Sequence, residues 1–235
     1  MAITRTQSAS GTVAGGTSIT VTLGGSPANG SRTILVVVTS GSTANRVSSI
    51  SQTGATWSKA VESTNASGCT TEIWSTGFVS SGGAGITVNL AASLTAVAIA
   101  VEYANLSTTT DKTATNTGTH DITAAIDTGT TATTTSTNEL WVGACGTSSD
   151  NGGTLNNPTN SFTEVVDTDQ GAYRIAFEEK IVSSTGTANT AATPTIVAAG
   201  AWAGAIATFP QMIGAGIGAS YIQHTHKDTY GARPR

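Results

Sequence analysis

The fold is decided by Thr33-Ile-Leu-Val-Val-Val-Thr-Ser-Gly41, in which five consecutive large apolar residues lie between two threonines. Most of these residues are β-branched, and their restricted χ1 angles favour a pleated strand. Because the apolar residues are continuous rather than alternating, we expect other elements to cover both faces of this strand. A similar run, Asn138-Glu-Leu-Trp-Val-Gly-Ala-Cys-Gly146, follows about 105 residues later. It predicts a second buried strand.

Three further segments recur in the same order. Gly54–Thr64 returns as Asn160–Thr168, Glu72–Ser81 as Ile175–Ser184, and Ala96–Tyr103 as Ala201–Phe209. The offsets are 103 to 106 residues, and large apolar residues recur at matching positions. The pattern predicts two structurally similar halves, or pseudo-repeats, at about residues 10–106 and 120–209.

The composition is typical of an all-β protein. There are 45 threonines and 27 glycines, and only 10% of the residues are charged. Threonine suits a pleated surface, and glycine, serine and asparagine supply turns. The sequence therefore predicts twelve to fourteen short strands in an antiparallel, jelly-roll-like β-sandwich. No Pro-rich or charged linker separates the halves, which favours one sandwich domain over residues 1–210. Two tandem sandwiches remain the alternative.

The repeat also predicts the core, because both copies keep large apolar residues at matching positions. We expect the following side chains to be mostly buried: Leu35, Val37, Trp57, Trp74, Val101, Leu140, Phe162, Phe177 and Ile206.

The charge pattern excludes several classes of partner. The net charge is −4 and the isoelectric point is near 5.2, so the chain lacks the basic footprint of a nucleic-acid-binding protein. The first residues, Met1 to Ser8, lack the apolar stretch of a signal peptide. No window approaches 18 apolar residues, so we expect neither a membrane span nor a membrane partner.

Residues that could support catalysis are scarce. The three histidines, His120, His224 and His226, are not placed beside a candidate nucleophile, and no P-loop, nucleophile elbow or His-Glu-x-x-His motif occurs. We therefore expect no enzymatic activity, no cofactor and no metal. The carboxylate pairs Asp167/Asp169 and Glu178/Glu179 could face each other as in a glycosidase, but solvated charges on an exposed face are the favoured interpretation.

Cys69 and Cys145 are the only cysteines. They do not occupy matching positions in the repeat, with Cys69 expected in a loop and Cys145 at the end of a strand. Two small buried thiols are the favoured interpretation, and a disulfide bond between them remains open.

Residues 211–235 lack a core-building pattern of their own. Pro210 cannot donate to a sheet ladder, so we expect it to end the sandwich. The rest of the chain is then expected to be an extended assembly arm, in which tyrosine rings pack at a contact and arginines meet an acidic neighbour. Its candidate contact residues are Tyr221, His224, His226, Tyr230, Arg233 and Arg235.

His224-Thr-His226 in this arm resembles the His-x-His metal sites of some phage fibre and needle trimers. Residues i and i+2 of an extended segment point the same way, so a threefold axis would bring six imidazoles together. Two solvated or stacking histidines remain the favoured interpretation.

The strand order and composition of residues 10–210 resemble the β-sandwich structural proteins of tailed-phage virions. The features that carry the resemblance are Ile34–Val38, Gly54–Trp57, Glu72–Trp74 and Val101–Tyr103. It implies a non-enzymatic virion protein, either a capsid decoration protein or a tail or fibre component. Such a protein would be made in the host cytoplasm without a signal peptide, and would bind copies of itself and other capsid or tail proteins. The alternative function is a carbohydrate-binding or adhesin module.

Overall fold

The computed structural model describes residues 1–120, 124–148, 152–195 and 199–212, which form an all-β, antiparallel fold. The described residues contain these strands: β1 (Thr4–Thr22), β2 (Arg32–Ser40), β3 (Val47–Gln52), β4 (Trp57–Asn65), β5 (Cys69–Thr76), β6 (Gly85–Ala104), β7 (Thr113–His120), β8 (Ile126–Asp127), β9 (Glu139–Thr147), β10 (Leu155–Asn156), β11 (Thr163–Gln170), β12 (Tyr173–Val182), β13 (Ala191–Pro194) and β14 (Gly200–Pro210).

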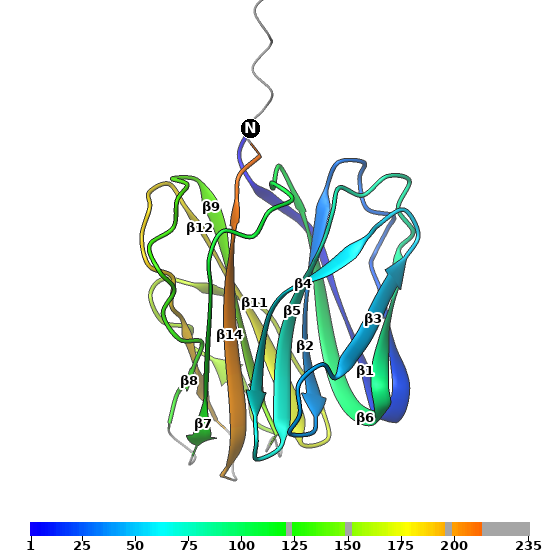
Figure 1. The fold of residues 1–235 in the computed structure, drawn as a ribbon, viewed down its shortest axis with the longest axis vertical. Helices are drawn as coiled ribbons and strands as arrows, with labels where there is room; N and C mark the ends of the chain where they lie inside the picture. Colours follow the sequence, from blue (N-terminus) through cyan, green and yellow to red (C-terminus); the bar gives the residue numbers. More distant parts are fainter. Residues whose placement is uncertain (121–123, 149–151, 196–198, 213–235) are drawn as a thin grey trace, which may run out of the picture.

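Two main sheets pack face to face as a β-sandwich (Figure 1). The first main sheet has the strand order β1-β6-β2-β5-β4, and the second has the order β11-β12-β9-β14-β7. In the described residues the chain completes the first sheet before it begins the second. The jelly-roll connection pattern is therefore not confirmed. Read in reverse, the second order is β7-β14-β9-β12-β11. Each of these strands then occupies the same place as its counterpart in the first sheet, as an internal repeat would produce. The repeat itself stays a prediction.

The core between the two main sheets is formed by alternate residues of the central strands. Ile34, Val36 and Val38 of β2 face this core, together with Phe177 of β12 and Phe209 of β14. Each of these side chains is fully buried. Burial of this apolar surface is the main force that holds the sheets together.

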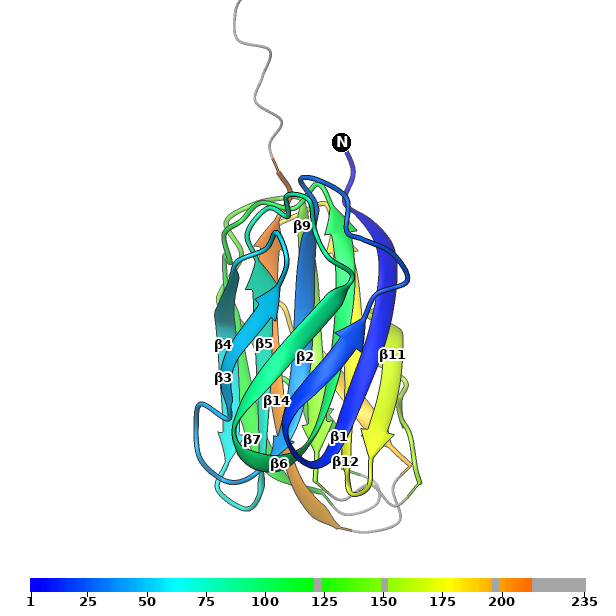
Figure 2. The same ribbon diagram turned by 90° about the vertical axis from the view of Figure 1, so that its right-hand side faces the viewer.

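A second core lies on the other face of the first main sheet. Leu35 and Val37 of β2 contact a cluster that includes Ile19 of β1 and Val88 of β6. This is possible because β1 and β6 are long and bend as one ribbon, so that half of it joins β3 as an outer layer (Figure 2). The β2 strand is thus covered on both faces, as its continuous apolar run predicts.

The second main sheet is also covered on its outer face. The small sheet β10-β13-β8 places Ile126, Leu155 and Ala192 against Cys145 and Trp202. Gly204 permits this close packing, because a Cβ at that position would overlap the carbonyl oxygen of Asp127. The segment between β6 and β9 thus supplies the edge strand β7 and the short β8 of the outer layer.

The predicted core is mostly confirmed. Seven of the nine positions are buried, whereas Trp57 and Trp74 are only partly buried. Trp74 lies on the outer face of the first sheet, where its indole N–H donates to the Glu72 carboxylate at 2.8 Å and Lys59 lies 5.4 Å from its ring centroid. A large aromatic residue in a strand can thus cover the rim of a core without entering it.

Candidate assembly surface

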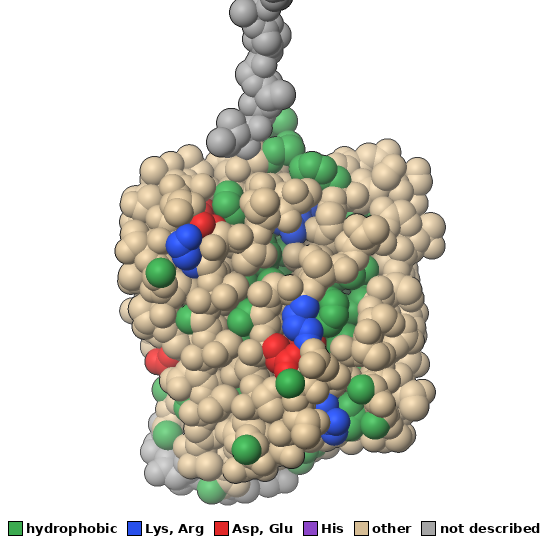
Figure 3. All heavy atoms as spheres, in the orientation of Figure 1, with side chains coloured by type: hydrophobic (Ala, Val, Ile, Leu, Met, Phe, Trp, Pro, Cys, Tyr) green, Lys and Arg blue, Asp and Glu red, His purple; other side chains and the backbone are tan. Residues whose placement is uncertain are grey.

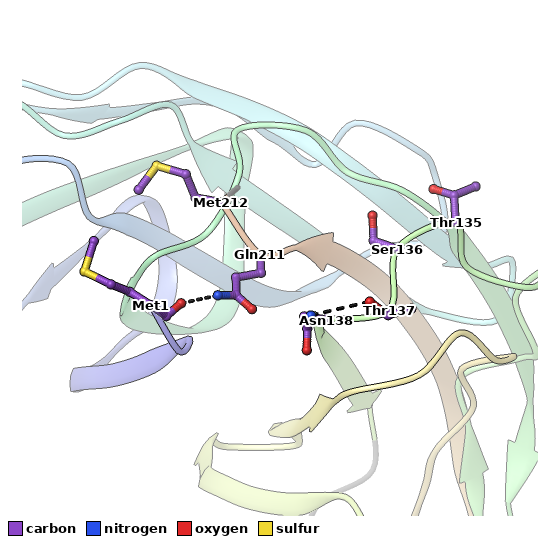
Figure 4. Close-up of a pocket in the computed structure, with 7 residues that line it drawn as sticks. All are labelled: Met1, Thr135, Ser136, Thr137, Asn138, Gln211 and Met212. Atoms are coloured by element: carbon purple, nitrogen blue, oxygen red, sulfur yellow. Dashed lines mark hydrogen bonds between the residues drawn. The ribbon is translucent and has the colours of Figure 1, made fainter. Parts of the chain in front are cut away.

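The first residues of the chain and the end of β14 lie together at one end of the sandwich (Figure 1). Gln211 donates from its side-chain amide to the Met1 carbonyl oxygen (Figure 4). Asn105 donates from its side-chain amide to the Ala2 carbonyl oxygen at 2.7 Å. We call this region, formed by Met1, 105–111, 135–138 and 210–212, the Met1 end.

Backbone hydrogen bonds fix the end of β14 to both halves of the molecule. The Gln211 N–H donates to the Asn138 carbonyl oxygen at 2.8 Å, and the Met212 N–H donates to the Asn105 carbonyl oxygen at 2.8 Å. Pro210 pairs with Glu139 and accepts from the Ser107 N–H at 2.8 Å. The chain therefore remains part of the sandwich for two residues beyond the predicted boundary at Pro210.

Arg32, at the start of β2, anchors the Met1 end from inside the sandwich. Its fully buried guanidinium donates to the Thr76 carbonyl oxygen at 2.7 Å, to the Ser75 hydroxyl at 2.8 Å and to the Ser107 carbonyl oxygen. It also lies 5.5 Å from the centroid of the Phe209 ring. Burial lowers the pKa of Arg32 to about 10, which leaves it cationic at neutral pH. The sequence analysis missed this anchor, for which a lone arginine at the start of an apolar strand was the available signal.

Asp111 ties two loops of the Met1 end together. Its carboxylate accepts from the Thr135 N–H at 2.6 Å, from the Thr135 hydroxyl at 2.7 Å and from the Lys112 ammonium at 2.8 Å. Burial acts to raise the pKa of Asp111, but these hydrogen bonds outweigh it and lower the pKa to about 2. The carboxylate therefore stays ionised, and the tie persists, over the physiological pH range.

The surface of the Met1 end is hollowed and carries apolar side chains. One groove of about 500 Å³ is lined by Met1, 135–138, Gln211 and Met212 (Figure 4), and a neighbouring hollow of about 540 Å³ includes Phe78. Met1 is 86% exposed and Phe78 is 48% exposed. Among the described residues only Ile181 is another large apolar side chain with such exposure. Exposed apolar surface is thus concentrated where residue 212 leads into 213–235.

The candidate contact residues of the arm, Tyr221, His224, His226, Tyr230, Arg233 and Arg235, lie outside the described residues. Composition did not single out Met1, Phe78 or Asp111, because a lone exposed apolar residue or aspartate has no recognisable pattern.

Of the four paired carboxylates, only Asp169 is exposed as expected, and Glu179 is partly buried and accepts from the Tyr103 hydroxyl. Glu178 is fully buried beneath Thr190, whose hydroxyl donates to it, and Asp167 forms an ion pair with Arg174 at 2.7 Å. Burial raises the pKa of Glu178 to about 7; the Thr190 hydrogen bond opposes the shift and the Glu164 charge adds to it. The overlying β13 layer, which the local pattern could not reveal, is the cause.

Both cysteines are buried and free, so the disulfide alternative is wrong. Burial raises the pKa of the Cys69 thiol to about 12 and that of Cys145 well above its ordinary value. Cys69 begins β5 rather than lying in a loop.

Other chemistry is sparse in the part of the chain that the structure describes. No group of three or more His, Cys, Asp and Glu side chains there is arranged to hold a metal ion. Within the same residues, no helix has the length and apolar character needed to cross a membrane.

Comparison with protein-family models, with curated proteins and with solved structures found no match to this chain.

Proposed function

We propose that this chain is a non-enzymatic structural protein of a virus particle, a capsid decoration protein or a tail or fibre component. In this role it assembles through contacts of its β-sandwich and through the segment that follows Met212. The observation that carries the proposal is the Met1 end, where exposed apolar side chains surround the point at which a firmly anchored strand leads into that segment. The virion context rests on the resemblance of strand order and composition.

The anchoring of β14 supports a role in which a contact made at the Met1 end is borne by the whole sandwich. Arg32, Asp111 and the backbone bonds of Gln211 and Met212 attach the Met1 end to both sheets. A partner bound there would engage the whole sandwich rather than a loose loop. The sandwich is rigid because each main sheet has a close-packed core on both of its faces.

Charge favours a second copy, or another acidic subunit, as the surface that receives residues 213–235. That segment contains Lys227, Arg233 and Arg235 but only one acidic residue, Asp228, whereas the chain as a whole carries −4. The visible face of the sandwich is mostly uncharged, and Asp/Glu side chains on it adjoin Lys/Arg side chains in two places (Figure 3). The net negative charge of a neighbouring subunit would attract the cations of the segment, and salt screens such an attraction.

A truncation tests the proposal. Removal of residues 213–235 keeps every hydrogen bond of Gln211 and Met212 described above, so the unfolding midpoint should stay nearly unchanged. Assembly, followed by sedimentation velocity and by incorporation into purified particles, should weaken, and raised salt should partly reproduce this loss in the full chain. Normal assembly of the truncated chain, or absence of the full chain from particles of its source, contradicts the proposal.

The alternative function, a carbohydrate-binding or adhesin module, is favoured by one separate observation. A groove lined with hydroxyl groups lies beside Trp141, and none of its lining residues belongs to the Met1 end.

A further inference from the structure

The groove beside Trp141 lies on the outer side of the second main sheet and has a volume of about 760 Å³. Asparagine, serine and threonine residues supply most of its polar lining, and neither aspartate nor glutamate contributes to it. Lys180 is the one charged residue that lines it.

Lys180 is held in place without being neutralised. Its ammonium lies 5.5 Å from the centroid of the Trp141 ring and 5.9 Å from that of Phe162, and it donates to the Asn160 carbonyl oxygen at 2.8 Å. It forms no ion pair with any described residue. Aromatic faces attract a cation without cancelling its charge. The groove therefore presents a positioned positive charge with hydrogen-bonding capacity left over.

The wall of the groove is rigid and locally strained. Asn160 and Ser161 have φ angles of +56° and +61°, a region that non-glycine residues seldom adopt. Asn160 donates from its side-chain amide to both the backbone and the side-chain oxygen of Asn189 at 3.0 Å, and Asn189 in turn donates to Asp127 at 3.0 Å. Such strain persists only where surrounding contacts enforce it, and it is concentrated at binding sites.

Hydroxyl groups line the remainder of the groove. None of these has a hydrogen-bond partner among the described residues, so each is available to a ligand: Thr130, Ser161, Ser183, Ser184, Thr185 and Thr187. Several hydroxyls and one cation match the hydroxyls and the single carboxylate of an acidic sugar.

We propose that this groove binds a saccharide that carries a carboxylate group. The Lys180 ammonium pairs with the carboxylate, and the serine and threonine hydroxyls exchange hydrogen bonds with the sugar hydroxyls. The single cation favours one carboxylate over a phosphate group, which proteins usually hold with several donors. The proposal does not rest on the assembly function, because no residue of the Met1 end contributes to the groove.

The test uses the full chain labelled with ¹⁵N and titrated with glucuronate. Chemical-shift changes should be confined to the Trp141 indole, the Gly186 amide and their neighbours. Glucose, which lacks the carboxylate, and acetate, which lacks the sugar hydroxyls, should each bind at least about tenfold more weakly, since a hydrogen bond to a charged group stabilises a complex by roughly 1.5–3 kcal/mol. A galacturonate tetramer is then compared with the galacturonate monomer. Tighter binding of the tetramer indicates that the groove takes a polysaccharide, and equal binding indicates a single terminal sugar; both outcomes support the proposal.

Matched variants assign the binding to Lys180. K180Q should weaken glucuronate binding about tenfold or more, K180R should retain most of it because arginine keeps the charge and stacks on aromatic rings, and R46Q should have no effect. R46Q carries the same charge change, and Arg46 contacts Thr43 and Ser40, away from the groove. The proposal is overturned if glucuronate causes no shifts in the groove, if acetate or glucose binds as well, or if K180Q binds like R46Q.

Discussion

Glu178 makes the stability of this protein depend on pH, and Glu178→Gln should remove that dependence. Glu178 lies on β12, and its carboxyl group is fully buried beneath Thr190, the residue directly before β13. Burial favours its protonated form, and the charge of Glu164 adds to the effect. Hydrogen bonds from Thr190 and Cys145 oppose the shift without cancelling it. The pKa of Glu178 is thus raised from 4.5 to about 7 in the folded protein.

The sign and size follow from linkage. Below pH 4.5 the carboxyl group is protonated in both the folded and unfolded states, and the full stability is present. As the pH rises from 4.5 to about 7, the unfolded chain ionises first and stability falls; above that range the loss is constant. A shift of this size corresponds to a loss of about 3 kcal/mol. Glutamine is neutral at every pH and keeps a similar shape, so it should not suffer this loss.

Urea denaturation of both proteins, at intervals from pH 4 to pH 9, measures the effect. At pH 4 the free energies of unfolding should differ by less than about 1 kcal/mol, and at pH 8 the Gln variant should be more stable by up to about 3 kcal/mol. Glu164→Gln should instead shift the wild-type decline to lower pH, because the Glu164 charge helps to raise the Glu178 pKa. Parallel curves for wild type and Glu178→Gln between pH 4.5 and 7 would refute the reasoning.

Three further outcomes are expected. Phe177→Ala should cost about 3–5 kcal/mol of unfolding free energy and Trp74→Ala distinctly less, because Phe177 is fully buried and Trp74 only partly so; equal costs in urea denaturation contradict this. Asn65→Ala should cost about 1–3 kcal/mol, since its amide donates to carbonyl oxygens of β7 and β14 at 2.7 and 2.9 Å; unchanged stability in the same assay shows that this bridge between the sheets is dispensable. Cys69 and Cys145 should react with a thiol reagent only in denaturant, because burial raises the pKa of both thiols; rapid labelling of the native chain contradicts that.

The sequence could predict the centre of the fold because its central strands are covered on both faces. Ile34–Val38 has no polar alternation, and this alone indicates layers on either side of β2. The first half of β1 gave no such signal. Residues 4–17 are mostly small and polar, and their strand is held by the backbone ladder to β6 rather than by a buried apolar stripe. Backbone pairing with a distant partner leaves no periodic mark in the sequence.

The candidate sites were harder to predict, because each depends on contacts between distant segments. Arg32 reaches Ser107, and Lys180 reaches the ring of Trp141, across many residues of chain. Glu178 looked like a solvated charge because its neighbour Glu179 is also acidic, and only the fold places Thr190 above it. A local pattern can indicate that a residue is in a strand, but not which layer will cover it.

In the described residues the chain crosses between the two main sheets once, in the connection between Ala104 at the end of β6 and Thr113 at the start of β7. Every core contact between the two main sheets therefore joins one half of the chain to the other, as subunits are joined in a dimer. Two copies that exchanged their second halves would rebuild the same core from different chains, with only this short connection changing its path. The arrangement thus allows intertwined dimers that require no new interface, and the length of the 105–112 connection determines how readily they form.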